Sequence, residues 1–182
     1  MHYVQPIATD IFIITKAEMA DIPRLVALIN GSYRGDASKQ GWTTEADLIA
    51  GEIRTDEEDL AGILAKETAT ILKYVHPKAG IVGSVYLEQK GERLYLGMLS
   101  VDVGWQASGI GKRMLAAAEE HAHELGCEAI MMQVIPTRTS LMEWYERHGY
   151  QATGERKPFD GDPKFGVPRV PLEFVILEKK LA

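Results

Sequence analysis

Three runs of alternating apolar residues between Ala69 and Val103 constrain the fold more than any other feature of the sequence. The runs ATILKYV, IVGSVYLEQ and RLYLGMLSVDV are separated by the short segments HPKAG and KGE. A period of two is typical of strands, and short turns join neighbouring strands that run antiparallel. The pattern predicts a three-stranded antiparallel meander, whose apolar face must be covered by other elements.

The segment before the meander predicts one strand and several helices. The apolar run IFIIT (11–15) has strand character, and residues 22–29 repeat at helical spacing. Next we expect a loop, then a short helix that is capped by a threonine of the pair Thr43-Thr44 and ends at Ile49. Another helix is predicted to start near Thr55.

The segment after the meander continues this alternation. We expect a helix over 109–125, a buried strand over 129–135, a helix over 140–148, strands over 150–155 and 172–179, and a loop over 156–171 between those two strands. A helix therefore connects the fourth predicted strand to the fifth. The predicted fold class is α/β, with one mixed sheet of about seven strands (α+β).

Composition narrows the class of protein. A chain of 182 residues with 46% hydrophobic and 25% charged residues predicts one globular domain over 1–182. No apolar run approaches the ~20 residues that cross a bilayer, and the N-terminus MHYVQPIATD does not resemble a signal peptide. We expect a cytoplasmic protein with no membrane partner, and the single cysteine excludes an internal disulfide.

The segment LSVDVGWQASGIGKRM (99–114) carries the clearest chemical signal. A predicted strand runs into a loop that contains Gln106, Gly109 and Gly111, and a helix begins within that loop. Uncovered amide groups and a helix N-terminus form a cradle that suits a pyrophosphate. A P-loop is excluded by Gln106 and Arg113, and a dinucleotide fingerprint is excluded by Met114 and the antiparallel context.

The loop QASGIG (106–111) resembles the Gln/Arg-x-x-Gly-x-Gly/Ala motif of the GNAT superfamily of N-acetyltransferases. WYERHGY (144–150) is similar to that family's later Tyr-x-x-x-Gly-Phe/Tyr motif, and the resemblance covers about 11–181. It implies a largely antiparallel central sheet with about four flanking helices. It also implies a V-shaped splay between the fourth and fifth strands, where acetyl-CoA binds.

The resemblance assigns a set of residues to acetyl-CoA. Strand backbone groups would pair with the pantetheine, loop amides would bind the pyrophosphate, and Arg138 would reach a phosphate or face solvent. Only the main chain of the strand residues is assigned this role, and their side chains are equally suited to the core. The assigned residues are Leu99, Ser100, Val101, Val103, Gln106, Ala107, Ser108, Gly109, Ile110, Gly111, Lys112 and Arg138.

The same resemblance implies catalytic roles. Tyr145 is the general acid that protonates the departing thiolate, because a phenol stays protonated near neutral pH. Glu88, Glu45 and Asp102 are candidates for the general base, and a relay of water molecules is an alternative. Tyr33, Trp42 and Phe165 lie in segments that the family topology places around the acceptor.

The expected partner is a small-molecule amine. A non-catalytic acyl-CoA-binding domain and an enzyme acting on a protein lysine or N-terminus are the alternatives, and a homodimer is possible. The formal charge of −6 argues against nucleic acid. Its concentration in residues 1–66, which hold 11 acidic and 6 basic residues, favours a cationic or neutral acceptor. No metal site is expected, because His121 and His123 point in different directions on one helix.

Overall fold

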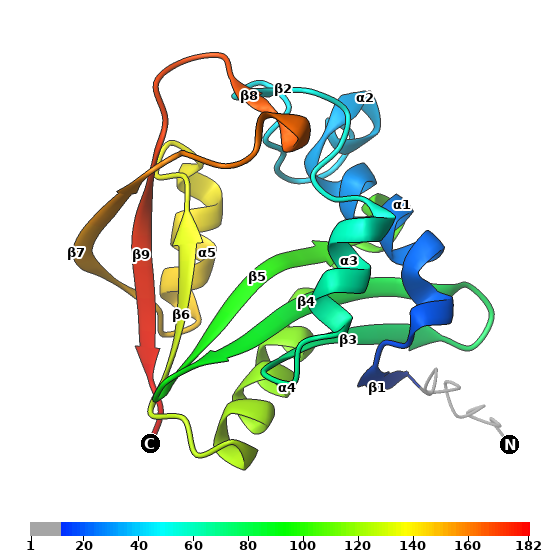
Figure 1. The fold of residues 1–182 in the computed structure, drawn as a ribbon, viewed down its shortest axis with the longest axis vertical. Coiled ribbons are helices and arrows are strands. Elements are labelled where there is room, and N and C mark those ends of the chain that lie inside the picture. Colours follow the sequence, from blue (N-terminus) through cyan, green and yellow to red (C-terminus); the bar gives the residue numbers. More distant parts are fainter. Residues whose placement is uncertain (1–11) are drawn as a thin grey trace, which may run out of the picture.

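The central sheet of the computed structural model, which describes residues 12–182, contains seven strands (Figure 1). Ile11, the first residue of the predicted strand 11–15, lies outside the described residues. In their order across the sheet the strands are β1 (Ile13–Lys16), β3 (Ala69–His76), β4 (Gly80–Lys90), β5 (Arg93–Val101), β6 (Ala129–Val134), β9 (Glu173–Lys180) and β7 (Gln151–Pro158).

The predicted meander is confirmed, because β3, β4 and β5 pair antiparallel in sequence order. Leu87 of β4 faces Leu96 of β5, and both side chains are buried. The pairing of β5 with β6 is parallel, while the other neighbouring pairs of the sheet are antiparallel. The mixed, largely antiparallel sheet is therefore confirmed.

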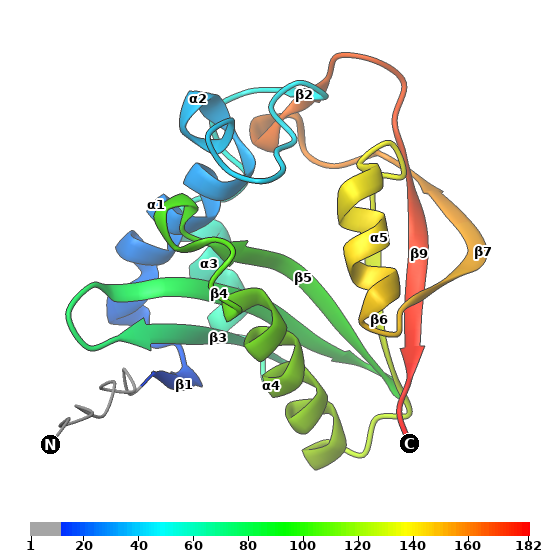
Figure 2. The ribbon, with the colours of Figure 1, turned by 180° about the vertical axis from the view of Figure 1, so that it is seen from behind.

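Helices cover both faces of the sheet. Helices α1 (Ile22–Tyr33) and α3 (Glu57–Leu64) lie on one face, and α4 (Ile110–Glu124) and α5 (Thr139–Arg147) lie on the other (Figures 1 and 2). Two buried apolar clusters correspond to these two layers. The remaining helical segments are α2 (Gly35–Ser38) and the 3-10 turns η1 (Met19–Asp21), η2 (Val103–Trp105) and η3 (Pro163–Phe165).

Strands β5 and β6 diverge, and the predicted splay is confirmed. Only Arg93, Leu94 and Tyr95 of β5 have partners on β6. Further along, the register of β4 with β5 shifts between Ser84 and Tyr86, and Met98 has a φ of 48°. A bulge of this kind bends a strand and re-aims its side chains. The two halves of the sheet consequently separate into the V of Figure 1.

A second, two-stranded sheet lies across the open end of the V (Figures 1 and 2). It pairs β2 (Ile49–Ala50) with β8 (Val167–Pro168). The predicted helix ending at Ile49 is wrong, because residues 46–48 form a turn and Ile49 begins a strand. The predicted loop 156–171 is also only partly correct, since β7 extends to Pro158 and β8 lies within that range.

Gly166 makes this small sheet possible. Its φ is 122°, a conformation that side chains disfavour, and an added Cβ would overlap Cγ2 of the buried Ile49. We therefore expect Gly166→Ala to lower the free energy of unfolding by about 1–3 kcal/mol. Urea denaturation measures the change. Gly161→Ala, in the same loop but with no atom within 4 Å of the added Cβ, should leave stability unchanged, and an equal loss in both variants would contradict the explanation.

Candidate active site

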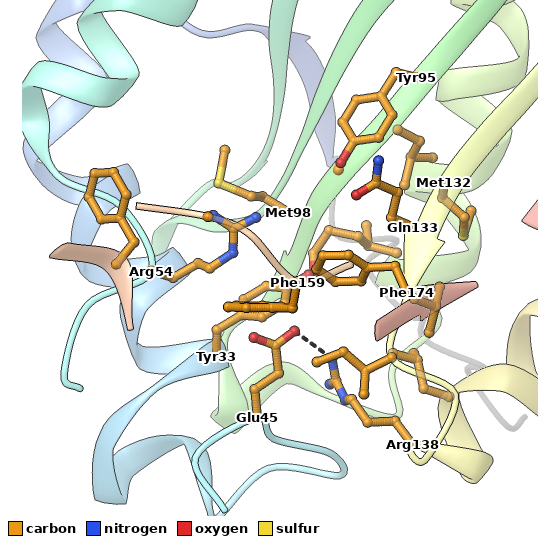
Figure 3. A pocket seen from close by; sticks show the side chains of 18 of the residues that line it. Tyr33, Glu45, Arg54, Tyr95, Met98, Met132, Gln133, Arg138, Phe159 and Phe174 are labelled. Carbon is orange, nitrogen blue, oxygen red and sulfur yellow. Dashed lines mark hydrogen bonds and ion pairs between the residues drawn. The ribbon is translucent and has the colours of Figure 1, made fainter. Parts of the chain in front are cut away.

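Two adjoining cavities lie in the splay between β5 and β6. One, of about 440 Å³, is lined by the glycine loop and α5, and is called the loop cavity. The other, of about 270 Å³, is lined by β5, β6 and the segment after β7, and is called the aromatic cavity (Figure 3). Five residues line both, and they mark the junction: Tyr33, Leu99, Arg138, Leu141 and Tyr145.

The glycine loop presents a row of uncovered amides. Gly109, with φ 83°, is the N-cap of α4, and Ala107 also has a positive φ of 63°. Within the described part of the chain, no backbone N–H of residues 107–112 donates a hydrogen bond to a protein group. The 15-residue helix α4 adds the positive end of its dipole at this point. The loop is therefore built to hold an anion.

Most of the predicted loop residues line this cavity. They are Gln106, Ala107, Gly109, Ile110, Gly111 and Lys112, whereas Ser108 and Val103 are not among its lining residues. The Ser108 hydroxyl donates instead to the Trp105 carbonyl. The Gln106 side chain accepts from the Trp42 amide at 2.6 Å and donates to the Val101 carbonyl at 3.2 Å. The Gln106 side chain therefore fixes the loop, and the main chain of the loop remains available to a ligand.

The unpaired edge of β5 carries the predicted strand residues. Leu99 and Val101 line the loop cavity, but the Ser100 side chain is buried and donates to the Met98 carbonyl at 3.0 Å. The Leu99 carbonyl accepts from the Tyr33 hydroxyl at 2.9 Å. A carbonyl has two lone pairs, so this bond orients Leu99 and still leaves one acceptor site.

Tyr145 lies at the junction of the two cavities. It projects from α5 and is 5% exposed, with its ring 5.1 Å from that of Trp144. Burial, with a smaller contribution from Tyr33, raises the pKa of Tyr145 well above its usual value. Burial and the nearby Glu45 likewise raise the pKa of Tyr33 to about 12. Both phenols therefore hold their protons across the neutral range, and each can donate one.

Glu45 and two arginines form a buried ionic network beside Tyr145. Arg34 donates to one carboxylate oxygen of Glu45, and Arg138 donates to the other at 3.1 Å. Arg138 also donates to the Thr43 hydroxyl at 3.1 Å. Burial lowers the pKa of Arg34, although Glu45 opposes this effect. The network joins the end of α1, the loop before β2 and the start of α5. Figure 3 shows its Glu45–Arg138 pair.

The other two candidate bases lie away from the cavities. Glu88 accepts from the Tyr86 hydroxyl and is 3.5 Å from the Lys66 ammonium, and it lines neither cavity. Asp102 pairs with Arg24 at 2.9 Å and accepts from the Gly104 amide at 3.1 Å. Among the three carboxylates, only Glu45 lines either cavity, since Glu88 lies on β4, one strand away from the splay, and Asp102 follows the end of β5.

The predicted acceptor residues divide between the cavities. Tyr33 lines both, Phe165 lines the aromatic cavity, and Trp42 lines the loop cavity beside Trp144. Several other large side chains of the aromatic cavity were not predicted from the sequence: Arg54, Tyr95, Met98, Met132, Phe159 and Phe174 (Figure 3). The alternation in β5 was the one available signal, since it places Tyr95 and Gly97 on one face.

The acidic residues of the N-terminal third do not surround the acceptor. Within residues 12–66, Glu45 is the sole acidic residue that lines either cavity, and both its oxygens face arginines. The negative charge of residues 1–66 therefore lends no support to the expected preference for a cationic or neutral acceptor.

Comparisons with known proteins identify the family and the fold. The model of the acetyltransferase (GNAT) family matches residues 24–150. The spermine/spermidine N(1)-acetyltransferase of Bacillus subtilis strain 168 is 32% identical over 69 residues, which are 37% of this chain and 45% of that protein. The chain thus matches less than half of the length of this curated relative.

Solved structures share the fold at low identity. PaiA N-acetyltransferase from Thermoplasma acidophilum, in complex with coenzyme A, has a TM-score of 0.71 at 19% identity and covers 94% of this chain and 99% of its own. The yncA structure from Salmonella typhimurium, with acetyl-CoA, has a TM-score of 0.67 at 15% identity over 94% of this chain and 95% of its own. In residues 12–182 no helix is long and apolar enough to cross a membrane.

Proposed function

The chain belongs to the GNAT family of acetyltransferases, whose cosubstrate is acetyl-CoA, and we propose that it acetylates the primary amine of a small molecule by direct attack. The observation that carries the proposal is the meeting of two cavities at Tyr145. One cavity suits a pyrophosphate-bearing donor, and the other suits an acceptor. We take residues 1–182 as one acetyltransferase domain. The location of the protein in the cytoplasm and its oligomeric state stay predictions.

The residues of the loop cavity fit coenzyme A. The uncovered amides of residues 107–112 would bind the pyrophosphate, with the Lys112 side chain nearby. Leu99 and Val101, on the unpaired edge of β5, would hold the pantetheine arm as an added strand does. Acetyl-CoA supplies the activated acetyl group as a thioester.

Tyr145 and Glu45 would move the protons. The buried Tyr145 phenol faces the junction and donates its proton to the departing thiolate. Glu45 is the buried carboxylate of the aromatic cavity, and it would accept a proton from the attacking amine, directly or through water. Arg34 and Arg138 hold both oxygens of Glu45 in position for this role.

A small acceptor is favoured over a protein chain by the β2–β8 sheet. It lies across the open end of the V, and the aromatic cavity beneath it has a volume of only about 270 Å³. That volume is near the lower end of small-molecule sites, which span about 300–1,000 Å³.

We expect millimolar acetyl-CoA to raise the melting temperature by several degrees, because a ligand stabilises the state that binds it. Gly111→Val should abolish most of this shift, since a Cβ at Gly111 already lies 3.2 Å from the Trp144 ring across the loop cavity. Gly62→Ala, at an exposed position of α3 with nothing within 4 Å of the added Cβ, should keep the shift. Differential scanning fluorimetry measures all three, and the absence of a shift in the unaltered chain would refute the donor site.

Tyr145→Phe should lower kcat by about 10²–10⁴-fold, the usual contribution of a positioned general acid. The thermal shift with acetyl-CoA should persist, because the phenol does not hold the pyrophosphate. Tyr150→Phe is the matched control, since its buried hydroxyl has no hydrogen-bond partner among the described residues. Thiol release with an accepted amine measures both variants. Unchanged turnover in Tyr145→Phe would show that another group protonates the thiolate.

Glu45→Gln should lower kcat by about 10²–10⁴-fold if Glu45 is the proton acceptor, whereas Glu88→Gln should leave kcat close to that of the unaltered chain. Glu45→Asp, which keeps a carboxylate, should retain part of the activity and so separate proton transfer from the ion pairs. A retained thermal shift with acetyl-CoA confirms that each variant keeps its loop cavity. Full turnover in Glu45→Gln would support the water relay instead.

A further inference from the structure

Arg54 is the one arginine of the aromatic cavity with no carboxylate partner among residues 12–182. It lies in the loop between β2 and α3, where its backbone amide donates to the Asn30 side chain at 2.7 Å. This bond fixes the position from which the side chain extends. Figure 3 shows the guanidinium reaching toward the middle of the cavity, between Met98 and Tyr33.

The neighbouring charges do not neutralise Arg54. Arg34 and Arg138 already occupy both oxygens of Glu45. The other acidic lining residues, Asp160 and Asp162, are exposed to solvent, and Asp162 accepts from the Lys164 amide at 2.9 Å. The Arg54 guanidinium lies over the Tyr33 ring, 6.0 Å from the ring centroid. Five donors of a partly buried arginine are therefore available to a ligand.

One side of the cavity is mostly apolar. Phe159 and Phe174 lie with their ring centroids 5.2 Å apart, and Met132 and Tyr95 complete this side. Such a surface binds a hydrocarbon or aromatic group. The cavity therefore offers three different environments: an apolar wall, a cationic guanidinium, and the junction with the donor site.

We propose that the acceptor is an amino acid with an apolar or aromatic side chain, and that Arg54 binds its carboxylate. This inference rests on the proposed function and narrows its substrate class. Arginine matches the geometry of a carboxylate because it donates two parallel hydrogen bonds. The α-amine then lies at the junction with Tyr145, and the side chain lies against Phe159 and Phe174. The amine nitrogen bonds to the acetyl carbon as the thioester C–S bond breaks. The proton lost by the nitrogen goes to Glu45, directly or through water, the departing thiolate takes the Tyr145 proton, and the carboxylate is unchanged.

A polycationic acceptor conflicts with the same geometry. A second ammonium group in the aromatic cavity would lie near Arg54, and the lining carboxylates that no cation of residues 12–182 pairs with, Asp160 and Asp162, are exposed to solvent. Like charges at short range in a partly buried site are unfavourable. Spermidine should therefore be a poor acceptor, although the sequence shares a matched segment with a spermine/spermidine acetyltransferase.

The test compares matched acceptors with and without a carboxylate. L-phenylalanine is compared with phenethylamine, L-methionine with 3-(methylthio)propylamine, and spermidine is added as a polycation. With acetyl-CoA and thiol release as the readout, we expect kcat/KM for each amino acid to exceed that of its decarboxylated partner by about 10- to 100-fold. Equal or better turnover of the decarboxylated amines or of spermidine would overturn the inference while leaving the acetyltransferase function intact.

Substitutions of Arg54 test whether this residue causes the preference for amino acids. Arg54→Gln should raise KM for the amino acids by about 10- to 100-fold and leave the thermal shift with acetyl-CoA unchanged, whereas Arg54→Lys should recover part of the loss. Arg156→Gln, an exposed arginine of β7 paired with Glu173, is the control and should behave like the unaltered chain. An amino-acid preference that survives in Arg54→Gln would overturn the assignment.

A binding measurement keeps the two proposals separable. If no amine is acetylated although acetyl-CoA binds, the proposed function fails. Calorimetric titration of L-phenylalanine and of phenethylamine into the CoA-saturated protein then decides the role of Arg54. Selective binding of L-phenylalanine that is lost in Arg54→Gln supports the carboxylate site, and the absence of such binding refutes it.

Discussion

The divergence of β5 from β6 is the constraint on which the site depends. The two strands share only three paired residues, and the positive φ of Met98 marks the bulge that bends β5. Unpaired strand edges are normally covered or blunted, because they attract other chains. Here α4 and α5 cover one face and the β2–β8 sheet lies across the open end, and the unpaired part of the β5 edge lines the loop cavity.

The ionic network around Glu45 determines how the acceptor side is assembled. Arg34, Glu45 and Arg138 come from distant parts of the chain and meet beneath Tyr33 and Tyr145. A buried ion pair is costly to break, because removing one partner leaves an uncompensated charge. The same network that would position the proton acceptor therefore also sets the distance between α1 and α5. Both oxygens of Glu45 bind Arg34 and Arg138, so Glu45 forms no ion pair with Arg54.

Local patterns in the sequence predicted the parts of the molecule that local interactions determine. The meander, the glycine loop with Gly109 and Gly111, and the helix bearing Tyr145 all follow from short-range periodicity and turn chemistry. The errors arose where distant segments meet. Ile49 looked like the end of a helix because its strand partner, Pro168, is far along the chain. Arg54 stands in a loop with no periodic pattern. The choice of Glu45 over Glu88 depends on tertiary structure, because the loop that carries Glu45 reaches the splay whereas Glu88 lies on β4, one strand away.

The pairing of β2 with β8 has a consequence for how such enzymes change. Most residues of the loop cavity lie between Leu99 and Arg147 and the others lie in residues 32–43, whereas of the two cavities residues 159–174 line only the aromatic cavity. The family model matches residues 24–150 and so ends before residues 159–174. Substitutions in residues 159–174 would therefore change the aromatic cavity and leave the walls of the loop cavity as they are. Tyr33 and Tyr145 line both cavities, so substitutions there would alter both at once.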